Sequence, residues 1–366
     1  MRILVVNAGS TTLKLSLLDD DKVLASRQVE VSDAESGQRA LEEALEELQT
    51  PEAVGHRVVH GGPAYTHAVR IDQGVRDRLE EYVGLAPLHQ PAALAGIDLV
   101  SRALPDVPVV ACFDTAFHAT MPPAASTYAV PAEWREEYGL RKYGFHGLSH
   151  AYAARRAAEM VGRPIEELRT VVCHLGAGAS VTAVRAGRSV DTTMGFTPLA
   201  GLVMASRSGD VDPGLLVWLL RNRVVDAEEL DTALERHSGL VGLAGTGDMR
   251  IVLDDAAAGD PRARLAVEVY LHRLRAQIAA MTASLGGLDV LAFTGGVGEH
   301  AAPIRDGAVR GLGYLGIEVD PDRNAEADGD TDISALACAV RTLVVTARED
   351  LEIAAEVRRV CAPEDR

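Results

Sequence analysis

Three glycine-rich turns, each following an apolar stretch, are the segments of this sequence best suited to bind phosphate. They lie at residues 7–10, 174–180 and 294–299, and each has polar neighbours. Glycine lets backbone N–H groups approach a phosphate closely, and successive amides form a concavity that attracts anions. The sequence lacks G-x-x-x-x-G-K-[ST], which excludes a P-loop NTPase, and lacks G-x-G-x-x-G after its first strand, which disfavours a dinucleotide site. We therefore predict that the turns hold a nucleotide.

Lys14 follows the first of these turns, on the face of a predicted strand opposite to Leu13, Leu15 and Leu17. Such a lysine is either a solvated strand residue or a phosphate ligand at the mouth of the turn. Residues 170–188 repeat the pattern of the first twenty residues, namely an apolar strand, a glycine turn with a small hydroxyl residue, and an alternating strand. This repeat favours the phosphate ligand.

The elements that must position these turns alternate between strands and helices, which indicates layers of α and β structure. Hydrophobic periodicity predicts strands near 3–6, 11–20, 23–31, 53–60, 108–113, 170–175, 179–188 and 289–294, and helices near 40–48, 147–162, 212–222 and 260–285. The acidic tract at 320–332 is expected to be a surface loop. The pattern repeat places a domain boundary near residue 150.

Composition excludes several classes of function. The 366 residues are 47% apolar, which is enough for a full core, and carry a net charge of −17. Such acidity argues against general binding to nucleic acid or to anionic membranes. The N-terminus does not resemble a signal peptide, and no run of about 18 apolar residues predicts a membrane span. The four cysteines form no C-x-x-C pair, and Cys112 and Cys173 lie in apolar runs, so we expect buried thiols and a cytoplasmic location.

Seven motifs together carry a resemblance to a known family. They occur in the order VVNAGSTTLKLSL, GHRVVHGG, FDTAFH, RKYGFHGLSH, HLGAGAS, DTTMGFTPLAGLVMASRSGDVDPG and FTGGVGEH. From end to end the sequence resembles the acetokinase family, in the superfamily of acetate and sugar kinases, heat-shock proteins and actin. The resemblance implies an α/β protein with two domains of duplicated ribonuclease H-like (actin-like ATPase) fold and a nucleotide cleft between them. It divides the chain into 1–150 and 151–348, with a C-terminal helix at about 349–366 packing back on the first domain.

The implied reaction is the reversible, Mg²⁺-dependent transfer of a phosphoryl group from ATP to acetate, giving acetyl phosphate and ADP in a homodimer. Mn²⁺ is an alternative metal. A carboxylate that approaches an anionic phosphate needs arginines, a metal and neutral donors, and it needs no strong base because it is already ionised. By resemblance, Arg57 binds acetate, and Asp114, His146 and Arg207 are catalytic. We expect Asp114 to orient Arg57 or to bind the metal through water, and not to transfer a proton.

The remaining site residues also follow from the resemblance. Asn7 and Glu349 are the metal positions, although an extra residue in TAREDLEIA leaves Asp350 as an alternative to Glu349. The acetate pocket is assigned to Val59, Leu88, Phe145 and Pro198. The nucleotide is assigned to Lys14, His174, Leu175, Gly176, Ala177, Gly178, Asp248, Met249, Arg250, Gly296, Val297, Gly298, Glu299 and His300.

Three departures from the family pattern qualify this picture. Ala177 and His300 replace asparagines, and PLHQPAA at 87–93 replaces a run richer in Asn and Pro. We expect the loss of an amide donor at Ala177 to slow phosphoryl transfer or to weaken nucleotide binding. The alternatives are a kinase for propionate or another short-chain acid, a pyrophosphate donor, a non-catalytic actin-like protein, and a sugar kinase. Retention of Arg57, Asp114, His146 and Arg207 together argues against a non-catalytic protein. A sugar kinase would need a base, which Asp114 could be, but the pair of arginines favours a carboxylate substrate.

Overall fold

The computed structural model describes residues 1–9, 12–30, 34–87, 89–336 and 338–362. It divides into two compact units: unit 1 holds residues 1–119, 145–152 and 348–366, and unit 2 holds residues 120–144 and 153–347. The sequence-based division at residue 150 differs in assigning 120–144 to the first half. These residues join unit 2 because the backbone N–H groups of Tyr143 and Gly144 donate to the Gly195 carbonyl at 3.0 and 3.1 Å.

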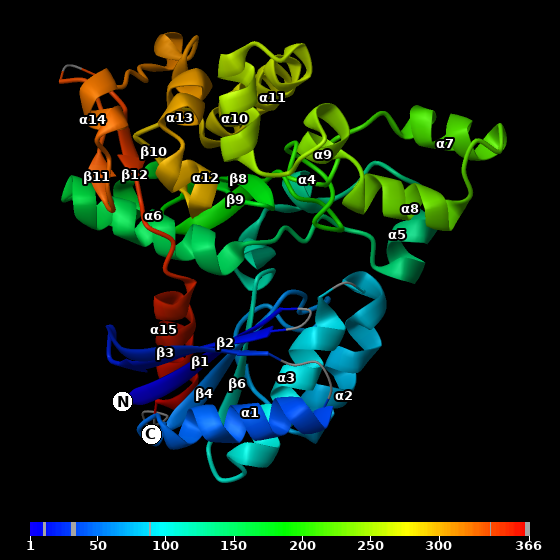
Figure 1. Ribbon diagram of the computed structural model, residues 1–366, viewed down its shortest axis with the longest axis vertical. Helices are drawn as coiled ribbons and strands as arrows, with labels where there is room; N and C mark the ends of the chain where they lie inside the picture. Colours follow the sequence, from blue (N-terminus) through cyan, green and yellow to red (C-terminus); the bar gives the residue numbers. More distant parts are fainter. Residues whose placement is uncertain (10–11, 31–33, 88, 337, 363–366) are drawn as a thin grey trace. The chain divides into compact units, whose positions relative to one another are not determined.

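Unit 1 is built on a six-stranded sheet of order β3-β2-β1-β4-β6-β5 (Figure 1). The strands β1, β2 and β3 form an antiparallel meander, whereas β4 and β6 run parallel to β1. The elements are β1 (Arg2–Ala8), β2 (Thr12–Asp19), β3 (Lys22–Glu30), α1 (Ala34–Glu46), β4 (Ala53–Val58), β5 (Val69–Arg70), α2 (Gln73–Glu81), α3 (Gln90–Ala103), β6 (Val109–Phe113) and α15 (Glu349–Cys361).

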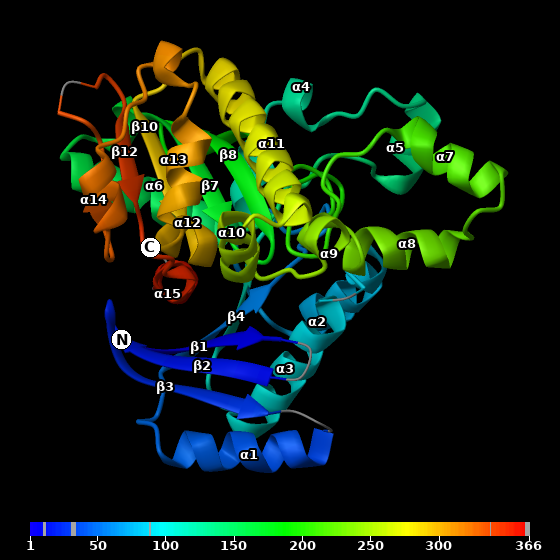
Figure 2. The ribbon, with the colours of Figure 1, turned by 45° about the horizontal axis from the view of Figure 1, so that its top comes forward.

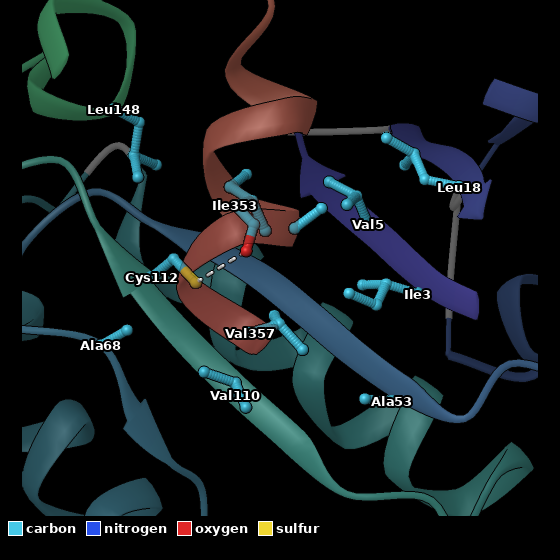
Figure 3. Packing of buried hydrophobic residues seen from close by; sticks show 11 residues of the cluster. Ile3, Val5, Leu18, Ala53, Ala68, Val110, Cys112, Leu148, Ile353 and Val357 are labelled. Carbon is cyan, nitrogen blue, oxygen red and sulfur yellow. Dashed lines mark hydrogen bonds between the residues drawn. The ribbon is translucent and has the colours of Figure 1, made fainter. Parts of the chain in front are cut away.

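The two faces of this sheet are covered by different helices, as the alternation of strand side chains requires. Ile3 and Val5 pack in one cluster with Ile353 and Val357 of α15, which Figure 3 shows from close by. Their neighbours in sequence pack in a second cluster with residues of α1 and α3. Gly55 on β4 permits the approach of α15, because a Cβ there would lie 2.5 Å from the Cγ2 of Ile353.

Unit 2 is built on a second six-stranded sheet, of order β11-β12-β10-β7-β8-β9, and the long helix α11 packs against β7, β8 and β9 (Figure 2). Its strands are β7 (Arg169–Leu175), β8 (Ala179–Arg185), β9 (Arg188–Thr192), β10 (Val290–Thr294), β11 (Thr331–Asp332) and β12 (Arg341–Val344). Its helices are α4 (Pro123–Ser126), α5 (Ala132–Tyr138), α7 (Pro213–Arg221), α8 (Ala227–Arg236), α9 (Gly239–Ala244), α10 (Met249–Ala258), α11 (Pro261–Leu285), α12 (Gly295–His300), α13 (Ala302–Val309) and α14 (Pro321–Ala325), and α6 (Gly147–Val161) contains the unit boundary.

The two sheets have the same connectivity. In each, three antiparallel strands are followed by two strands parallel to the first, and a short antiparallel strand completes the edge. The turn between β1 and β2 therefore corresponds to the turn between β7 and β8. This duplication places the first two predicted glycine turns at equivalent positions of the two units.

Two sequence-based expectations about local structure are wrong. The third glycine turn, at 294–299, is largely the short helix α12, whose first residue, Gly295, has a φ of +78° that glycine tolerates. The tract at 320–332 is not a plain loop, because Asp320 caps α14 by accepting hydrogen bonds from the N–H groups of Asp322 and Arg323, and Thr331 and Asp332 form β11.

The four cysteines are not joined in disulfides, and burial raises the pKa of Cys112 and Cys173 well above the usual thiol range. Cys112 lies under α15, where its Sγ is 3.9 Å from the Ile353 carbonyl (Figure 3). Both thiols are therefore poor nucleophiles. In the described part of the chain, no helix combines the length and the apolar character that a membrane crossing requires.

Candidate active site

The first group of predicted site residues meets around Arg57, at the end of β4. The Arg57 guanidinium binds the Asp114 carboxylate in a bidentate pair, with Nε donating to Oδ1 at 3.0 Å and Nη2 to Oδ2 at 2.6 Å. Its Nη1 lies 3.4 Å from the Asn7 Oδ1, and its Nε lies 3.7 Å from the Glu349 Oε2. Unit 1 thus brings together four of the predicted residues, from β1, β4, the end of β6 and the start of α15.

Strand order explains this meeting. Since β1, β4 and β6 are parallel neighbours, Asn7, Arg57 and Asp114 all lie at the carboxyl ends of their strands. Backbone hydrogen bonds fix Asp114 on both sides. The Asp114 N–H donates to the Val58 carbonyl at 3.0 Å, and the Asp114 carbonyl accepts from the Gly147 N–H at 2.8 Å. A Cβ at Gly147 would lie 2.2 Å from that carbonyl oxygen, so glycine is required there.

Burial and charge act in opposite directions on the central ion pair. Burial lowers the pKa of Arg57, but the nearby charges of Asp114 and Glu349 outweigh it, so the pKa lies above its ordinary value and the guanidinium stays charged. Burial raises the pKa of Asp114 above its ordinary value, although the Arg57 guanidinium and a hydrogen bond from the His146 backbone oppose the rise. The site is therefore a cation held in place by a carboxylate that is 2% exposed.

His146 occupies a strained position next to this pair. Its φ is +59°, in the left-handed region that non-glycine residues seldom adopt. The turn is fixed by the Gly147 contact with Asp114 and by the His150 N–H, which donates to the His146 carbonyl at 2.9 Å. Such strain persists where the surrounding structure determines it, and it is frequent at functional sites.

Glu349 and Asp350 are the two alternatives for the predicted metal ligand, and their ion-pair partners differ. Glu349 faces Arg57, whereas Asp350 accepts two hydrogen bonds from Arg348, each 2.9 Å long. Asn7 and Glu349 supply oxygen donors of the kind that Mg²⁺ prefers, and Mg²⁺ needs few protein ligands because it keeps several waters. The described residues hold no cluster of three His, Cys, Asp or Glu side chains suited to a metal. An amide oxygen and a carboxylate fit a Mg²⁺ ion that keeps most of its water ligands.

The remaining predicted residues of unit 1 are placed as follows. Lys14 is exposed on β2, directly opposite Asn7 in the strand register. Phe145 is buried and meets His60 edge to face, with ring centroids 5.4 Å apart. Val59 is half-buried, one residue beyond β4. Leu88 lies outside the described residues, and Pro198 belongs to unit 2, so the structure does not bring the four predicted acetate-pocket residues together within one unit.

Unit 2 contains a pocket of about 760 Å³. Eight of the predicted nucleotide residues line it: Gly176, Ala177, Asp248, Met249, Arg250, Gly296, Val297 and His300. Its other lining residues are Ala205, Leu240, Gly247, Leu253, Asp254, Tyr270, Ala301 and Pro303. The volume falls in the range of ligand pockets, about 300–1,000 Å³, and the mixture of many apolar with a few polar groups is typical of them.

Three structural features shape this pocket. The turn after β7 is closed by the Gly176 N–H, which donates to the Gly178 carbonyl at 2.9 Å, and it leaves Ala177 exposed. Asp248 caps α10 by accepting from the Arg250 N–H at 2.9 Å, and its carboxylate also binds the Arg250 side chain. These contacts lower the pKa of Asp248 to about 2, so it is anionic at neutral pH.

Besides Lys14 of unit 1, five predicted nucleotide residues do not line the pocket. Leu175 and Gly298 are buried in the packing of unit 2, and Glu299 accepts a hydrogen bond from the Ala347 N–H at 3.0 Å. His174 and Gly178 flank the turn that contributes Gly176 and Ala177. These residues flank or belong to the turn after β7 and helix α12, whose other residues reach the pocket.

Arg207 lies beyond the pocket lining in the loop after β9. Its Nε donates to the Glu235 Oε2 at 2.8 Å, and its Nη1 lies 3.5 Å from the Pro198 carbonyl. Sequence reasoning missed Glu235 and the apolar lining residues of the pocket. No motif marks Glu235 on α8, or Leu240, Leu253 and Tyr270 on α9 to α11, because tertiary packing decides where these helices lie.

Comparisons with known proteins show which family this chain resembles. The sequence profile described as the acetokinase family matches residues 36–355. The chain is 54% identical to acetate kinase of Synechococcus sp. (strain JA-2-3B'a(2-13)), over 82% of this chain and 74% of that protein. The structure resembles that of Porphyromonas gingivalis acetate kinase, with 34% identity and a TM-score of 0.91 over 98% of this chain and 99% of that one.

A propionate kinase from Francisella tularensis is equally similar in structure, with 36% identity and a TM-score of 0.91 over 98% of this chain and 99% of that one. Both likenesses extend over nearly the whole chain. The α/β fold with two duplicated units, of the actin-like ATPase type, is thereby confirmed.

Proposed function

Because the chain belongs to the acetokinase family, we propose that it catalyses the reversible transfer of a phosphoryl group from ATP to acetate, giving acetyl phosphate and ADP. The observation that carries this proposal is the fixed guanidinium of Arg57. Asp114 occupies its Nε and Nη2 edge at 3.0 and 2.6 Å, and Asn7 makes a longer contact of 3.4 Å with Nη1. The Nη1 and Nη2 edge is the part of Arg57 proposed to bind the acetate carboxylate in a bidentate manner.

The pocket of unit 2 is the proposed site of the nucleotide. Its volume of about 760 Å³ and its apolar lining suit a base and ribose, whereas pyrophosphate would leave most of that surface uncovered. The Gly176–Ala177 turn would meet the phosphates through its backbone N–H groups, and Asp248 with Arg250 would meet the adenosine. Lys14 is a further proposed phosphate ligand. ATP is therefore favoured over pyrophosphate as the donor.

The proposed mechanism needs no general base. Acetate is ionised at neutral pH, so the catalytic task is to overcome its repulsion from phosphate and to stabilise charge on the transferred group. Arg57 binds and orients the carboxylate, and Asp114 holds Arg57 in the required rotamer. His146 and Arg207 are the proposed donors to the phosphoryl oxygens in the transition state. Asp114 neither accepts nor donates a proton during the reaction.

Mg²⁺ is the proposed metal, held by Asn7 and Glu349 with water and phosphate oxygens, and Mn²⁺ would satisfy the same donors. When bound, the ion would neutralise charge on the transferring phosphate. Asp350 is less suited to this task because Arg348 already binds both of its carboxylate oxygens.

Propionate is the second candidate substrate. The similarity to a propionate kinase is as extensive as that to an acetate kinase. One methylene discriminates by only about 1–3 kcal/mol in an apolar pocket, so both acids are expected to react at different rates.

A homodimer is proposed on the basis of α7. This nine-residue helix has no buried residue, and it exposes Leu215, Val217, Trp218 and Leu220, of which Trp218 is 54% exposed. An apolar cluster of this kind on a surface helix marks an interface.

A cytoplasmic location is also proposed, since the reaction draws on ATP and four free cysteines suit a reducing compartment.

The reverse reaction tests the proposal. Purified protein is mixed with acetyl phosphate and Mg-ADP, and the ATP formed is measured by luminescence, for the native chain and for Arg57→Ala. The native chain should form ATP, and Arg57→Ala should lose at least about 100-fold in kcat/KM for acetyl phosphate, since misplacement of a substrate costs that much. Equal activity of the two would contradict the assigned role of Arg57, and no ATP from the native chain would contradict the proposed reaction.

A further inference from the structure

Arg207 lies in the loop after β9 and is held by the Glu235 carboxylate of helix α8 in the same unit. Its Nε donates to the Glu235 Oε2 at 2.8 Å, and the two side chains are only 16% and 13% exposed. An ion pair that is largely removed from water fixes its partners more firmly than a surface pair does. The rotamer of Arg207 is therefore tied to the position of Glu235.

The backbone around Glu235 is tied to the loop that carries Arg207. We name residues 234–241 the strap. The Ser208 N–H donates to the Leu234 carbonyl at 3.1 Å, the Ser238 N–H donates to the Ser206 carbonyl at 3.0 Å, and the Ser206 hydroxyl donates to the Glu235 carbonyl at 2.9 Å. The strap thus binds the Arg207 loop on both sides of the arginine.

The backbone of the strap also lies so close to the Arg207 loop that a side chain would not fit between them at Gly239. Gly239 has a φ of +60°, and a Cβ there would lie 2.2 Å from the Met204 carbonyl oxygen and 2.6 Å from that of Arg207. The same loop reaches the pocket, because Ala205 lines it and the Ala205 N–H donates to the Ala177 carbonyl at 3.0 Å. One hydrogen-bonded network therefore joins Glu235, Arg207 and the turn that carries Ala177.

Glu235 does not stabilise the helix on which it lies, α8. Glu235 lies in the last turn of α8, where a negative charge opposes the helix dipole and a basic residue is preferred. The helix is already capped at its start by the reciprocal bonds of Asp226 and Glu229. A carboxylate at this position is instead explained by the arginine that it holds.

We propose that Glu235 is a positioning residue for the phosphoryl-transfer step. Its carboxylate fixes the Arg207 guanidinium directly, and the strap holds Glu235 beside the Arg207 loop. This inference rests on the proposed function, in which Arg207 stabilises the transferred phosphoryl group. A positioning role and a purely electrostatic one predict opposite effects. Loss of the negative charge alone would make the neighbourhood of Arg207 more attractive to anions, whereas loss of positioning lowers the rate of the chemical step.

The test compares Glu235→Gln, Glu235→Asp and Glu235→Ala with the native chain in the acetyl phosphate-forming direction. Positioning predicts a fall in kcat of about 10-fold for Gln and Asp and about 100-fold for Ala, with the KM for ATP and the dissociation constant for ADP changed less than about 3-fold. Glu228→Gln, in the exposed first turn of the same helix, is the matched control and should retain native kinetics.

A double-mutant cycle separates positioning through Arg207 from a general structural effect. In an Arg207→Ala background, Glu235→Gln should cause no further loss of kcat, because the group that it positions is gone. Native kcat in Glu235→Gln and Glu235→Asp, or an additive loss in the cycle, would overturn the inference while leaving the proposed function intact. A native chain that forms no acyl phosphate would overturn both.

Discussion

The Arg57 guanidinium and the Asp114 carboxylate form a bidentate pair at the carboxyl ends of two adjacent parallel strands, with N–O distances of 3.0 and 2.6 Å. Asp114 is almost fully buried, so it cannot release Arg57 without leaving a charge without a partner. This geometry supports an orienting role for Asp114, which leads to the first prediction.

Asp114→Asn should lower kcat/KM for acetate by about 100-fold, because the amide cannot accept both arginine hydrogen bonds and the guanidinium moves. The matched control is Asp98→Asn, which alters a similar bidentate pair of unit 1 with Arg76, at 3.1 and 2.9 Å, away from the proposed site. Steady-state kinetics of both variants checks this. A native rate in Asp114→Asn would contradict the orienting role.

The same account predicts that no proton is transferred in the rate-determining chemistry. The native chain should show a ratio of kcat in H₂O to kcat in D₂O near unity, measured at matched points of the pH profile. A general base would require proton transfer in the transition state. A ratio of about 2 or more, lost in Asp114→Asn, would assign the proton to Asp114 after all.

Ala177→Asn tests the departure in the first turn of unit 2. Ala177 is exposed and lines the proposed nucleotide pocket, so an amide there would have room to reach a phosphate. One added hydrogen bond is worth about 1 kcal/mol, so the KM for ATP should fall by about 5-fold or kcat should rise by a similar factor. Ala177→Leu, which has similar bulk and no amide, is the control. Unchanged kinetics in Ala177→Asn would show that the missing donor has no effect.

The buried side chain of His56 should make the stability of unit 1 depend on pH. It is buried on β4, on the sheet face that packs against α3, and burial lowers its pKa from 6.5 to about 3. Protonation therefore favours the unfolded chain. Stability should be complete above pH 6.5 and should fall as the pH decreases toward 3, by about 2 kcal/mol at pH 5.

Urea unfolding followed by circular dichroism at pH 7 and pH 5 measures this loss. His56→Leu should lose about 2 kcal/mol less than the native chain between the two pH values, because it cannot bind the proton. An identical loss in His56→Leu would exclude His56 as the cause.

Trp218→Glu should weaken the proposed homodimer. A charge in the exposed apolar cluster of α7 opposes burial of that surface, so the variant should elute as a monomer where the native chain is a dimer. Light scattering after size-exclusion chromatography gives the mass directly. Trp134→Glu, on α5 and also exposed, is the control and should remain dimeric. A native monomer would contradict the proposed homodimer, and a dimeric Trp218→Glu would exclude α7 as the interface.

Much of the fold could be predicted from the sequence, because the relevant signals are local. The alternation of Leu13, Leu15 and Leu17 marks β2, and the pattern repeat at 170–188 anticipates the two sheets of equal connectivity. The short helix α12 could not be predicted, since GGVGEH has poor helix propensity and owes its form to tertiary contacts. The buried Arg305 is one of these, and it donates to the carbonyls of Gly298 and Glu299 at 2.9 and 2.7 Å.

The candidate site shows the same division. Arg57, Asp114 and Asn7 lie in strand-end motifs, and their meeting follows from parallel strand order. Glu235 has no such signal, because its role depends on how α8 packs on a loop nearly thirty residues earlier in the chain. The positions of Leu240 and Tyr270 in the lining of the unit 2 pocket are likewise a product of packing.

The most direct test of the central claim uses hydroxylamine to trap acyl phosphates. Purified protein is incubated with Mg-ATP and, in separate reactions, acetate, propionate, butyrate and glycerol, and the hydroxamate formed is measured. The account predicts most hydroxamate from acetate, less from propionate and none from glycerol. No hydroxamate from any of the acids would contradict the claim that this chain transfers a phosphoryl group from ATP to a carboxylate.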